Sequence, residues 1–214
     1  MIKGIASDMD GTLIDTANVI ANAQYKTLKD FYPGLSREEL LRLKGVQLKT
    51  IISRYTSRND EAFLQELTAN INKDILSSLP DNLPFEETAE VLHTLRSQGI
   101  RIAIATGLSR TILLEVVRKS GLIQLVDVIV SSHDVQQGKP APDVFLEAFR
   151  RIGVKPTEGL VMGDSDNDIT PGNEIGAFTV FVSREGLKNE RARFSISSLR
   201  PLPELMDRIN SQKQ

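Results

Sequence analysis

Short apolar runs alternate with amphipathic stretches along most of the sequence, and this alternation limits the folds open to the chain. Runs typical of buried strands cover residues 2–7, 101–105, 126–131, 159–162 and 178–182, with a weaker sixth at 194–197. Helical patterns lie between them at 86–98, 109–120 and 142–152, and a glycine follows each pattern. Near-continuous β-branched runs favour strands covered on both faces. The pattern predicts an α/β fold with a doubly wound, Rossmann-like parallel sheet.

The alternation is interrupted after the first predicted strand. Residues 17–84 contain no convincing strand, whereas Ser36 and Glu39 have the spacing of a capping box and residues 60–77 carry apolar side chains at helical spacing. Asp15 lies just before this inserted segment, where it would be either the N-cap of the first inserted helix or part of a site. We therefore expect two domains: an α/β core of residues 1–16 plus 85–214, and a small all-helical cap of residues 17–84.

Composition excludes several classes of protein. The 214 residues carry a formal net charge of −2, which argues against a nucleic-acid partner. No run approaches the ~18 uncharged apolar residues of a membrane span, and the N-terminus reaches Asp8 too early for a signal peptide. The absence of Cys rules out disulfides and thiolate metal sites. We expect a cytoplasmic monomer with neither a nucleic-acid nor a membrane partner.

Polar residues follow four of the predicted strands. In a parallel sheet the carboxyl ends of the strands meet at one edge, where ligands bind. The residues at these ends are Asp8 and Asp10 after the first strand, Thr106 and Gly107 after the second, Lys139 in the loop after the third, and Asp164, Asp166 and Asp168 after the fourth. We therefore expect these side chains to form one site.

The carboxylates of this set predict a metal. Several aspartates at one edge would repel each other and raise some of their pKa values unless a cation lies between them. An all-oxygen set selects a hard cation, and a phosphate partner favours Mg²⁺ over Ca²⁺. The metal and Lys139 would offset the repulsion between a carboxylate and a phosphate dianion. Thr106 and backbone N–H groups near Gly107 would donate hydrogen bonds to phosphoryl oxygens.

The same residues resemble the four ordered motifs of the haloacid dehalogenase superfamily. The matching segments are Asp8-Met9-Asp10-Gly11-Thr12-Leu13-Ile14-Asp15, Ala105-Thr106-Gly107, Gly138-Lys139-Pro140-Ala141-Pro142-Asp143 and Gly163-Asp164-Ser165-Asp166-Asn167-Asp168. The resemblance covers the whole chain, including a helical cap after the first motif, and looks like the branch with phosphoglycolate phosphatase and β-phosphoglucomutase. Two positions depart from the pattern: many relatives have Asn where this chain has Gly107, and Thr170-Pro171-Gly172 replaces a commoner small-residue helix.

The resemblance implies catalytic roles. Asp8 would attack phosphorus and form an aspartyl-phosphate, and Asp10 would protonate the leaving oxygen and then deprotonate the hydrolytic water. Thr106 and Lys139 would assist that chemistry. The phosphate would be bound by four residues: Met9, Thr106, Gly107 and Lys139.

The resemblance also implies a metal site and a contact from the cap. Mg²⁺ would be held by the Asp8 carboxylate, the Asp10 backbone carbonyl and the Asp164 carboxylate, and Asp168 would support that shell or orient Lys139. In the cap, Lys44 and Gly45 would meet the substrate, unless Lys44 is only a solvated charge at a helix end. The sequence leaves open the roles of Asp166, Asp15 and His133.

The sequence thus predicts a Mg²⁺-dependent phosphatase acting on a small phosphorylated metabolite, such as a sugar phosphate, phosphoglycolate or a nucleotide monophosphate. One alternative is a phosphomutase, because Asp10 would serve both reactions. Another is a non-enzymatic phosphoacceptor switch. The helical insertion and the position of Asp8 after the first strand argue against the switch.

Overall fold

A six-stranded parallel sheet forms the centre of the molecule. The computed structural model describes residues 1–58 and 60–211. The strands are β1 (Gly4–Ser7), β2 (Arg101–Thr106), β3 (Val128–Ser131), β4 (Gly159–Gly163), β5 (Phe178–Val182) and β6 (Phe194–Ile196), in the spatial order β3-β2-β1-β4-β5-β6. The order reverses on the two sides of β1, which is the place where ligands bind in such sheets. The predicted α/β, doubly wound sheet is confirmed.

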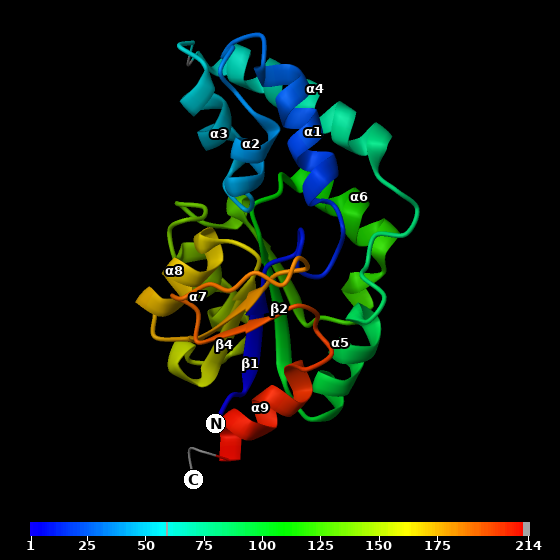
Figure 1. The fold of residues 1–214 in the computed structure, drawn as a ribbon, viewed down its shortest axis with the longest axis vertical. Helices are drawn as coiled ribbons and strands as arrows, with labels where there is room; N and C mark the ends of the chain where they lie inside the picture. The colour runs from blue at the N-terminus through cyan, green and yellow to red at the C-terminus, as the bar shows by residue number, and fades with distance from the viewer. Residues whose placement is uncertain (59, 212–214) are drawn as a thin grey trace.

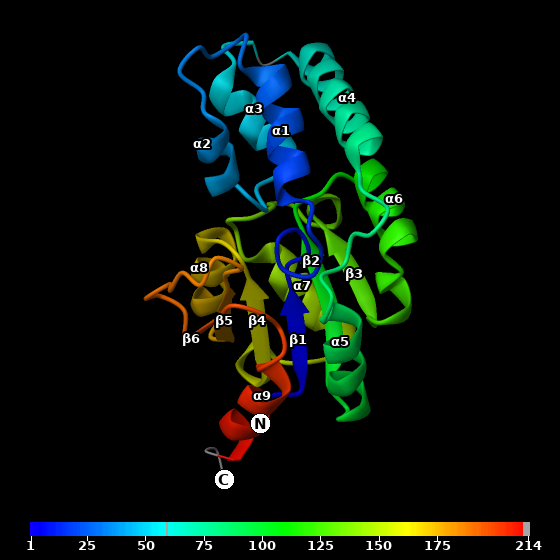
Figure 2. The same ribbon diagram turned by 45° about the vertical axis from the view of Figure 1, so that its right-hand side comes forward.

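Helices cover both faces of the sheet (Figure 2). On one face lie α7 (Asp143–Ile152) and α8 (Asp166–Glu174); the other carries α5 (Thr88–Ser97), α6 (Arg110–Ser120) and α9 (Leu202–Ser211). Successive strand residues alternate between the faces, so Ile5 joins the core under α5 while Ala6 joins the core under α7. Small alanines on the α7 face leave room for its buried phenylalanines, which keeps this helix close to the strands that form the site.

Local signals explain where the helices end. Gly121 and Gly153 take left-handed conformations at the ends of α6 and α7, with φ of 67° and 65°. Glycine adopts this conformation without a Cβ penalty, so the helix ends there and the chain turns back toward the next strand. The segment Thr170-Pro171-Gly172 lies inside α8, where a Cβ on Gly172 would lie 2.8 Å from the Thr179 side chain. This glycine therefore lets α8 pack closely on β5.

Four helices lie together beyond the carboxyl edge of the sheet (Figures 1 and 2). They are α1 (Ala17–Leu28), α2 (Arg37–Arg42), α3 (Leu48–Tyr55) and α4 (Glu61–Ser78). The Ser36 side chain caps α2 by accepting a hydrogen bond from the Glu39 N–H, but the Glu39 carboxylate accepts one from the Tyr55 hydroxyl at 2.7 Å. Half of the predicted capping box therefore forms. The arrangement supports a cap of residues 17–84, although that division into domains stays a prediction.

The two connections between core and helical layer run side by side. The N–H of Asp15 donates to the Leu83 carbonyl at 2.8 Å, and the N–H of Phe85 donates to the Leu13 carbonyl at 3.1 Å. The Arg184 guanidinium lies over the Phe85 ring at 3.6 Å and donates to the Thr12 carbonyl at 2.6 Å. These contacts tie the loop after β1 to both connections.

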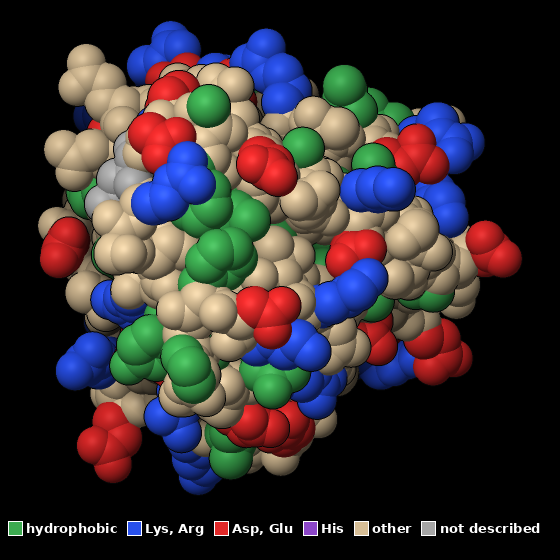
Figure 3. All heavy atoms as spheres, turned by 90° about the horizontal axis from the view of Figure 1, so that it is seen from above, with side chains coloured by type: hydrophobic (Ala, Val, Ile, Leu, Met, Phe, Trp, Pro, Cys, Tyr) green, Lys and Arg blue, Asp and Glu red, His purple; other side chains and the backbone are tan. Residues whose placement is uncertain are grey.

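None of the helices in the described part of the chain has the length and hydropathy needed to cross a bilayer. Seen from above, the surface carries Lys and Arg mixed with Asp and Glu, with hydrophobic side chains between them (Figure 3).

Candidate active site

The loop after β1 places Asp8 at the centre of the carboxyl edge. Asp8 is 2% exposed, and its N–H donates to the Met162 carbonyl of β4 at 2.8 Å. The loop then passes very close to Asp164. Gly11 has φ of 82°, and a Cβ there would lie 2.1 Å from Asp164 Oδ2. Only glycine suits both the conformation and the space, which brings the β1 and β4 loops together.

Lys139 joins two of the carboxylates. Its buried Nζ lies 2.6 Å from Asp8 Oδ1 and 2.6 Å from Asp168 Oδ1. Asp168 is itself held by Ser165, whose N–H and hydroxyl donate to Oδ2 at 3.2 and 2.7 Å in the capping box that begins α8. Asp168 and Asp8 therefore contact the same ammonium, and the role of Asp168 in orienting Lys139 stays a prediction.

Two threonines hold Asp10. The Thr16 hydroxyl donates to Asp10 Oδ1 at 2.5 Å, and the Thr106 hydroxyl donates to Oδ2 at 3.4 Å. Thr16 was not among the residues predicted for the site. Thr16 occupies the N-cap position of α1, but its side chain makes no capping bond and turns to Asp10 instead. Because Thr16 occupies the N-cap position, the interpretation of Asp15 as the N-cap of this helix is wrong. The Asp15 side chain is exposed.

The donor set fits a hard cation. Carboxylate oxygens of Asp8, Asp164 and Asp168 lie within 4.8 Å of one another. Asp164 Oδ1 is buried and has no hydrogen-bond partner among the described residues, which leaves an oxygen free for a cation. The predicted ligand set paired Asp8 and Asp164 with Asp10. The Asp10 carboxylate faces the two threonines, so a contribution through its backbone carbonyl stays a prediction.

Burial makes these carboxylates resist ionisation. Desolvation raises the pKa of Asp8 to about 7, and neighbouring Asp168 and Asp164 oppose its charge while Lys139 favours it. Desolvation, with the charge of Asp8, also raises the pKa of Asp10 to about 7. The pKa of Asp164 rises to about 6, again mainly through burial. A bound Mg²⁺ would favour the ionised forms of the carboxylates around it.

A cap loop reaches into the site. Lys44 Nζ lies 2.6 Å from Asp164 Oδ2, and the Lys44 carbonyl accepts a hydrogen bond from Asn167 at 3.0 Å. The Gly45 carbonyl lies so close to Gly107 that a Cβ on Gly107 would be 2.1 Å from it. Both cap residues that the sequence singled out therefore lie against the candidate catalytic residues. The small Gly107, a departure from the family pattern, is what admits this loop.

Other candidate residues lie away from the centre. Asp166 has a 60% exposed side chain that pairs with Asn189 at 2.8 Å and with Arg191 at 3.6 Å, so it faces outward. His133 is exposed on the surface. The Met9 side chain is fully buried in the core, which leaves only its backbone to meet a phosphate.

Two spaces flank the site. A small inner cavity of about 50 Å³ is bounded by Asp10, Gly107 and the cap helices α1, α2 and α4. A wide outer cleft of about 800 Å³ is bounded by Gly11, Asp164 and Arg184. Lys44 contributes to both walls. A ligand whose phosphate lies over Asp8 would therefore extend into one space or the other.

Comparison with known proteins agrees with this geometry. The pattern of the haloacid dehalogenase-like hydrolases matches residues 5–182. The chain is similar to Pyrophosphatase PpaX of Bacillus cereus, with 32% identity over 85% of this chain and 83% of that protein. Among solved structures, β-phosphoglucomutase from Clostridium difficile has a TM-score of 0.85 at 20% identity, covering 99% of each chain. A putative haloacid dehalogenase-like hydrolase from Bacteroides fragilis has a TM-score of 0.80 at 26% identity, covering 94% of this chain and 100% of that one.

The four sequence motifs, the parallel α/β fold and the match to the family pattern all indicate the same family. The chain is a hydrolase that belongs to the haloacid dehalogenase-like family.

Proposed function

We propose that this hydrolase is a Mg²⁺-dependent phosphatase that removes phosphate from a small phosphorylated metabolite through an aspartyl-phosphate. One observation carries the proposal: two carboxylates two residues apart in the same buried loop have different partners. Asp8 lies against Lys139 at 2.6 Å, and Asp10 lies against Thr16 at 2.5 Å. Contact with an ammonium suits a nucleophile, whereas a hydroxyl-bound carboxyl with a raised pKa suits an acid that must hold a proton.

The first step forms a bond between an Asp8 oxygen and phosphorus and breaks the bond between phosphorus and the leaving oxygen. The proton of Asp10 goes to that leaving oxygen. In the second step the Asp10 carboxylate takes a proton from water, the water oxygen bonds to phosphorus, and the Asp8–phosphorus bond breaks. Inorganic phosphate leaves, and both aspartates return to their starting forms.

The remaining groups of the site counter negative charge. Lys139 would donate to phosphoryl oxygens while Asp168 keeps its ammonium in place, and Thr106 would donate from the second strand. Asp8, Asp164 and the Asp10 backbone carbonyl would hold Mg²⁺. When bound, this ion neutralises charge on the phosphoryl group.

The chemistry is tested by Asp8→Asn, with Asp207→Asn as the matched control because Asp207 is exposed on α9, at the end of the molecule opposite the cap (Figure 1). Acetyl phosphate is a suitable first substrate, since its small leaving group makes few demands on the cap. We expect Asp8→Asn to abolish phosphate release and Asp207→Asn to keep the wild-type rate. Chelator should stop release, and Mg²⁺ should restore it. Full activity of Asp8→Asn would refute the covalent route.

The phosphomutase alternative uses the same two aspartates. A relative named as a pyrophosphatase favours net hydrolysis. Net release of inorganic phosphate from a sugar monophosphate would support a phosphatase, whereas isomerisation that needs a catalytic amount of sugar bisphosphate would support a mutase. Membership of a hydrolase family argues against a non-enzymatic phosphoacceptor switch. The cytoplasmic location and monomeric state stay predictions.

A further inference from the structure

The inner cavity lies where the leaving group of the proposed reaction would go. Asp10 is part of its wall, and the group that Asp10 protonates has to lie within hydrogen-bond reach of it. Gly107 is also part of the wall and follows β2, which places the cavity between the catalytic edge and the cap. The chemistry of this wall therefore limits the leaving group.

The wall of the cavity is mostly apolar. Side chains from the cap and from α6 contribute to it, among them Ile20, Leu40, Leu48, Ile75 and Ile112. At ~10–15 Å³ for each water-sized group, a cavity of about 50 Å³ holds roughly three to five heavy atoms. A short carbon chain fits this space and gains free energy from losing water.

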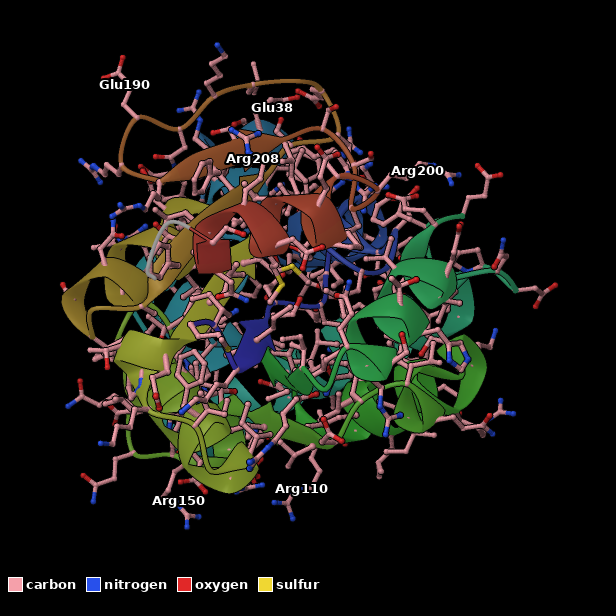
Figure 4. All side chains as sticks on the ribbon, turned by 90° about the horizontal axis from the view of Figure 1, so that it is seen from below. Glu38, Arg110, Arg150, Glu190, Arg200 and Arg208 are labelled. Atoms are coloured by element: carbon pink, nitrogen blue, oxygen red, sulfur yellow. The ribbon has the colours of Figure 1, made fainter. Side chains whose placement is uncertain are left out.

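Positive charge is scarce in the cavity. Among the described residues that form the wall, Lys44 is the only Lys or Arg, and its ammonium already lies 2.6 Å from Asp164. Elsewhere, Arg110, Arg150 and Arg200 extend outward from the rim of the molecule (Figure 4). A second phosphate or a carboxylate in the cavity would lose its hydration without gaining a free cation, which is strongly unfavourable.

One polar side chain in the wall lacks a partner. Gln24 on α1 is 6% exposed and forms part of the cavity wall, and its side-chain amide makes no hydrogen bond with any other described residue. A buried amide without a partner is costly, so such groups usually meet a ligand or water. Two other polar side chains of the wall have each other as partners, since the Ser109 hydroxyl donates to Asn72 Oδ1 at 3.4 Å.

We propose that the substrate is the phosphate monoester of a short, uncharged alcohol with an apolar carbon body and one further hydroxyl, and that Gln24 binds that hydroxyl. This inference rests on the proposed phosphatase function. It separates the chain from pyrophosphate, the substrate class suggested by the name of its relative, because the leaving group of pyrophosphate is a second phosphate.

The test compares four substrates at saturating Mg²⁺: 3-hydroxypropyl phosphate, n-butyl phosphate of matched length, phosphoglycolate and pyrophosphate. We expect the hydroxypropyl ester to have the highest kcat/KM, above phosphoglycolate and pyrophosphate, whose leaving groups carry a charge, by roughly a hundredfold or more. Gln24→Leu should lower kcat/KM for the hydroxypropyl ester by roughly five- to tenfold and leave the butyl ester within about twofold. Gln98→Leu, on the exposed end of α5, is the control.

Leu48→Lys adds a cation to the same wall and gives a test in the opposite direction. It should raise activity toward pyrophosphate and lower it toward the butyl ester. Pyrophosphate hydrolysis as fast as that of the hydroxypropyl ester, or an equal loss on both esters in Gln24→Leu, would overturn the inference. Asp8-dependent hydrolysis of acetyl phosphate with no activity on the alkyl esters would overturn it too. Absence of acetyl phosphate hydrolysis would instead refute the proposed phosphatase.

Discussion

Lys44 of the cap and Asp164 of the core form an ion pair, with Nζ 2.6 Å from Oδ2. The two residues are 120 positions apart in the sequence. The Lys44 side chain is 28% exposed and that of Asp164 is 7% exposed, so the pair lies at the inner edge of the cleft. Asp164 is also a predicted Mg²⁺ ligand. The cap lysine therefore neutralises the carboxylate that the metal would use.

Lys44→Met should strengthen Mg²⁺ binding to the substrate-free protein. Removing the ammonium leaves the Asp164 carboxylate with less competition for a cation, and we expect the dissociation constant to fall roughly three- to tenfold. Isothermal titration calorimetry measures this directly. Lys29→Met, on an exposed position of the cap, should leave the constant unchanged. Weaker binding in Lys44→Met would show that the lysine supports the metal site.

Gly107→Ala should push the cap loop away from the core. A Cβ at this position would lie 2.1 Å from the Gly45 carbonyl oxygen, so the loop has to move. We expect kcat/KM to fall by roughly tenfold or more because the reacting groups lose their placement. Small-angle scattering should show a more open particle. Gly34→Ala is the control, since its Cβ would meet only ordinary contacts at 3.5 Å or beyond.

Thr16→Val removes the hydroxyl that holds Asp10 while keeping the shape of the side chain. The Thr16 hydrogen bond lowers the pKa of Asp10 against the effect of burial, so its loss should raise that pKa further. Steps that need the Asp10 carboxylate should then require a higher pH, and kcat near neutral pH should fall roughly tenfold. The pH profile of kcat is the measurement. Thr94→Val, at an exposed position of α5, is the control and should leave the pH profile unchanged. An unshifted profile in Thr16→Val would contradict the role of Thr16.

Asp10 should make the stability of the metal-free protein depend on pH. Burial raises its native pKa to about 7 from an ordinary value of 3.8, so between these values the native carboxyl keeps a proton that the unfolded chain has lost. The native state binds more protons than the unfolded chain in this pH window. The contribution of Asp10 to the free energy of unfolding therefore falls as pH rises. The expected loss is a few kcal/mol, at about 1.4 kcal/mol per pKa unit.

Urea titrations with chelator measure this dependence. The free energy of unfolding of wild type, minus that of Asp10→Asn, should decline between about pH 4 and pH 7 and level off above that range. Subtracting the variant removes the contributions of the carboxyls that do not interact with Asp10. A difference that rises with pH would mean that the Asp10 carboxylate is favoured in the native protein.

Much of the core could be predicted because its signals are local. The predicted strand at 178–182 has the observed bounds, and the one at 101–105 is extended by Thr106 alone. The helices before Gly121 and Gly153 end where those glycines allow a left-handed turn. Strand periodicity and helix-ending glycines depend on neighbouring residues only, so they can be recognised in the sequence itself.

The partners of the site residues could not be predicted in the same way. Ser36 and Glu39 have the spacing of a capping box, yet Tyr55 takes the Glu39 carboxylate because α3 packs beside α2. Thr16 has the position and residue type of a helix cap, yet its hydroxyl is directed to Asp10. In each case a residue outside the local capping motif offers a polar partner, and tertiary packing decides which bond forms.

The sequence by itself determined the α/β core and the set of polar residues at four strand ends, because parallel strands bring their carboxyl ends to one edge whatever the details of packing. Only the tertiary structure decided that Lys139 bridges Asp8 and Asp168, that Lys44 reaches Asp164, and that Gln24 forms part of the wall of a small apolar cavity. These relations depend on how closely the cap approaches the core. That distance is set by side-chain volume at contacts such as Gly107 with Gly45, between segments far apart in the chain.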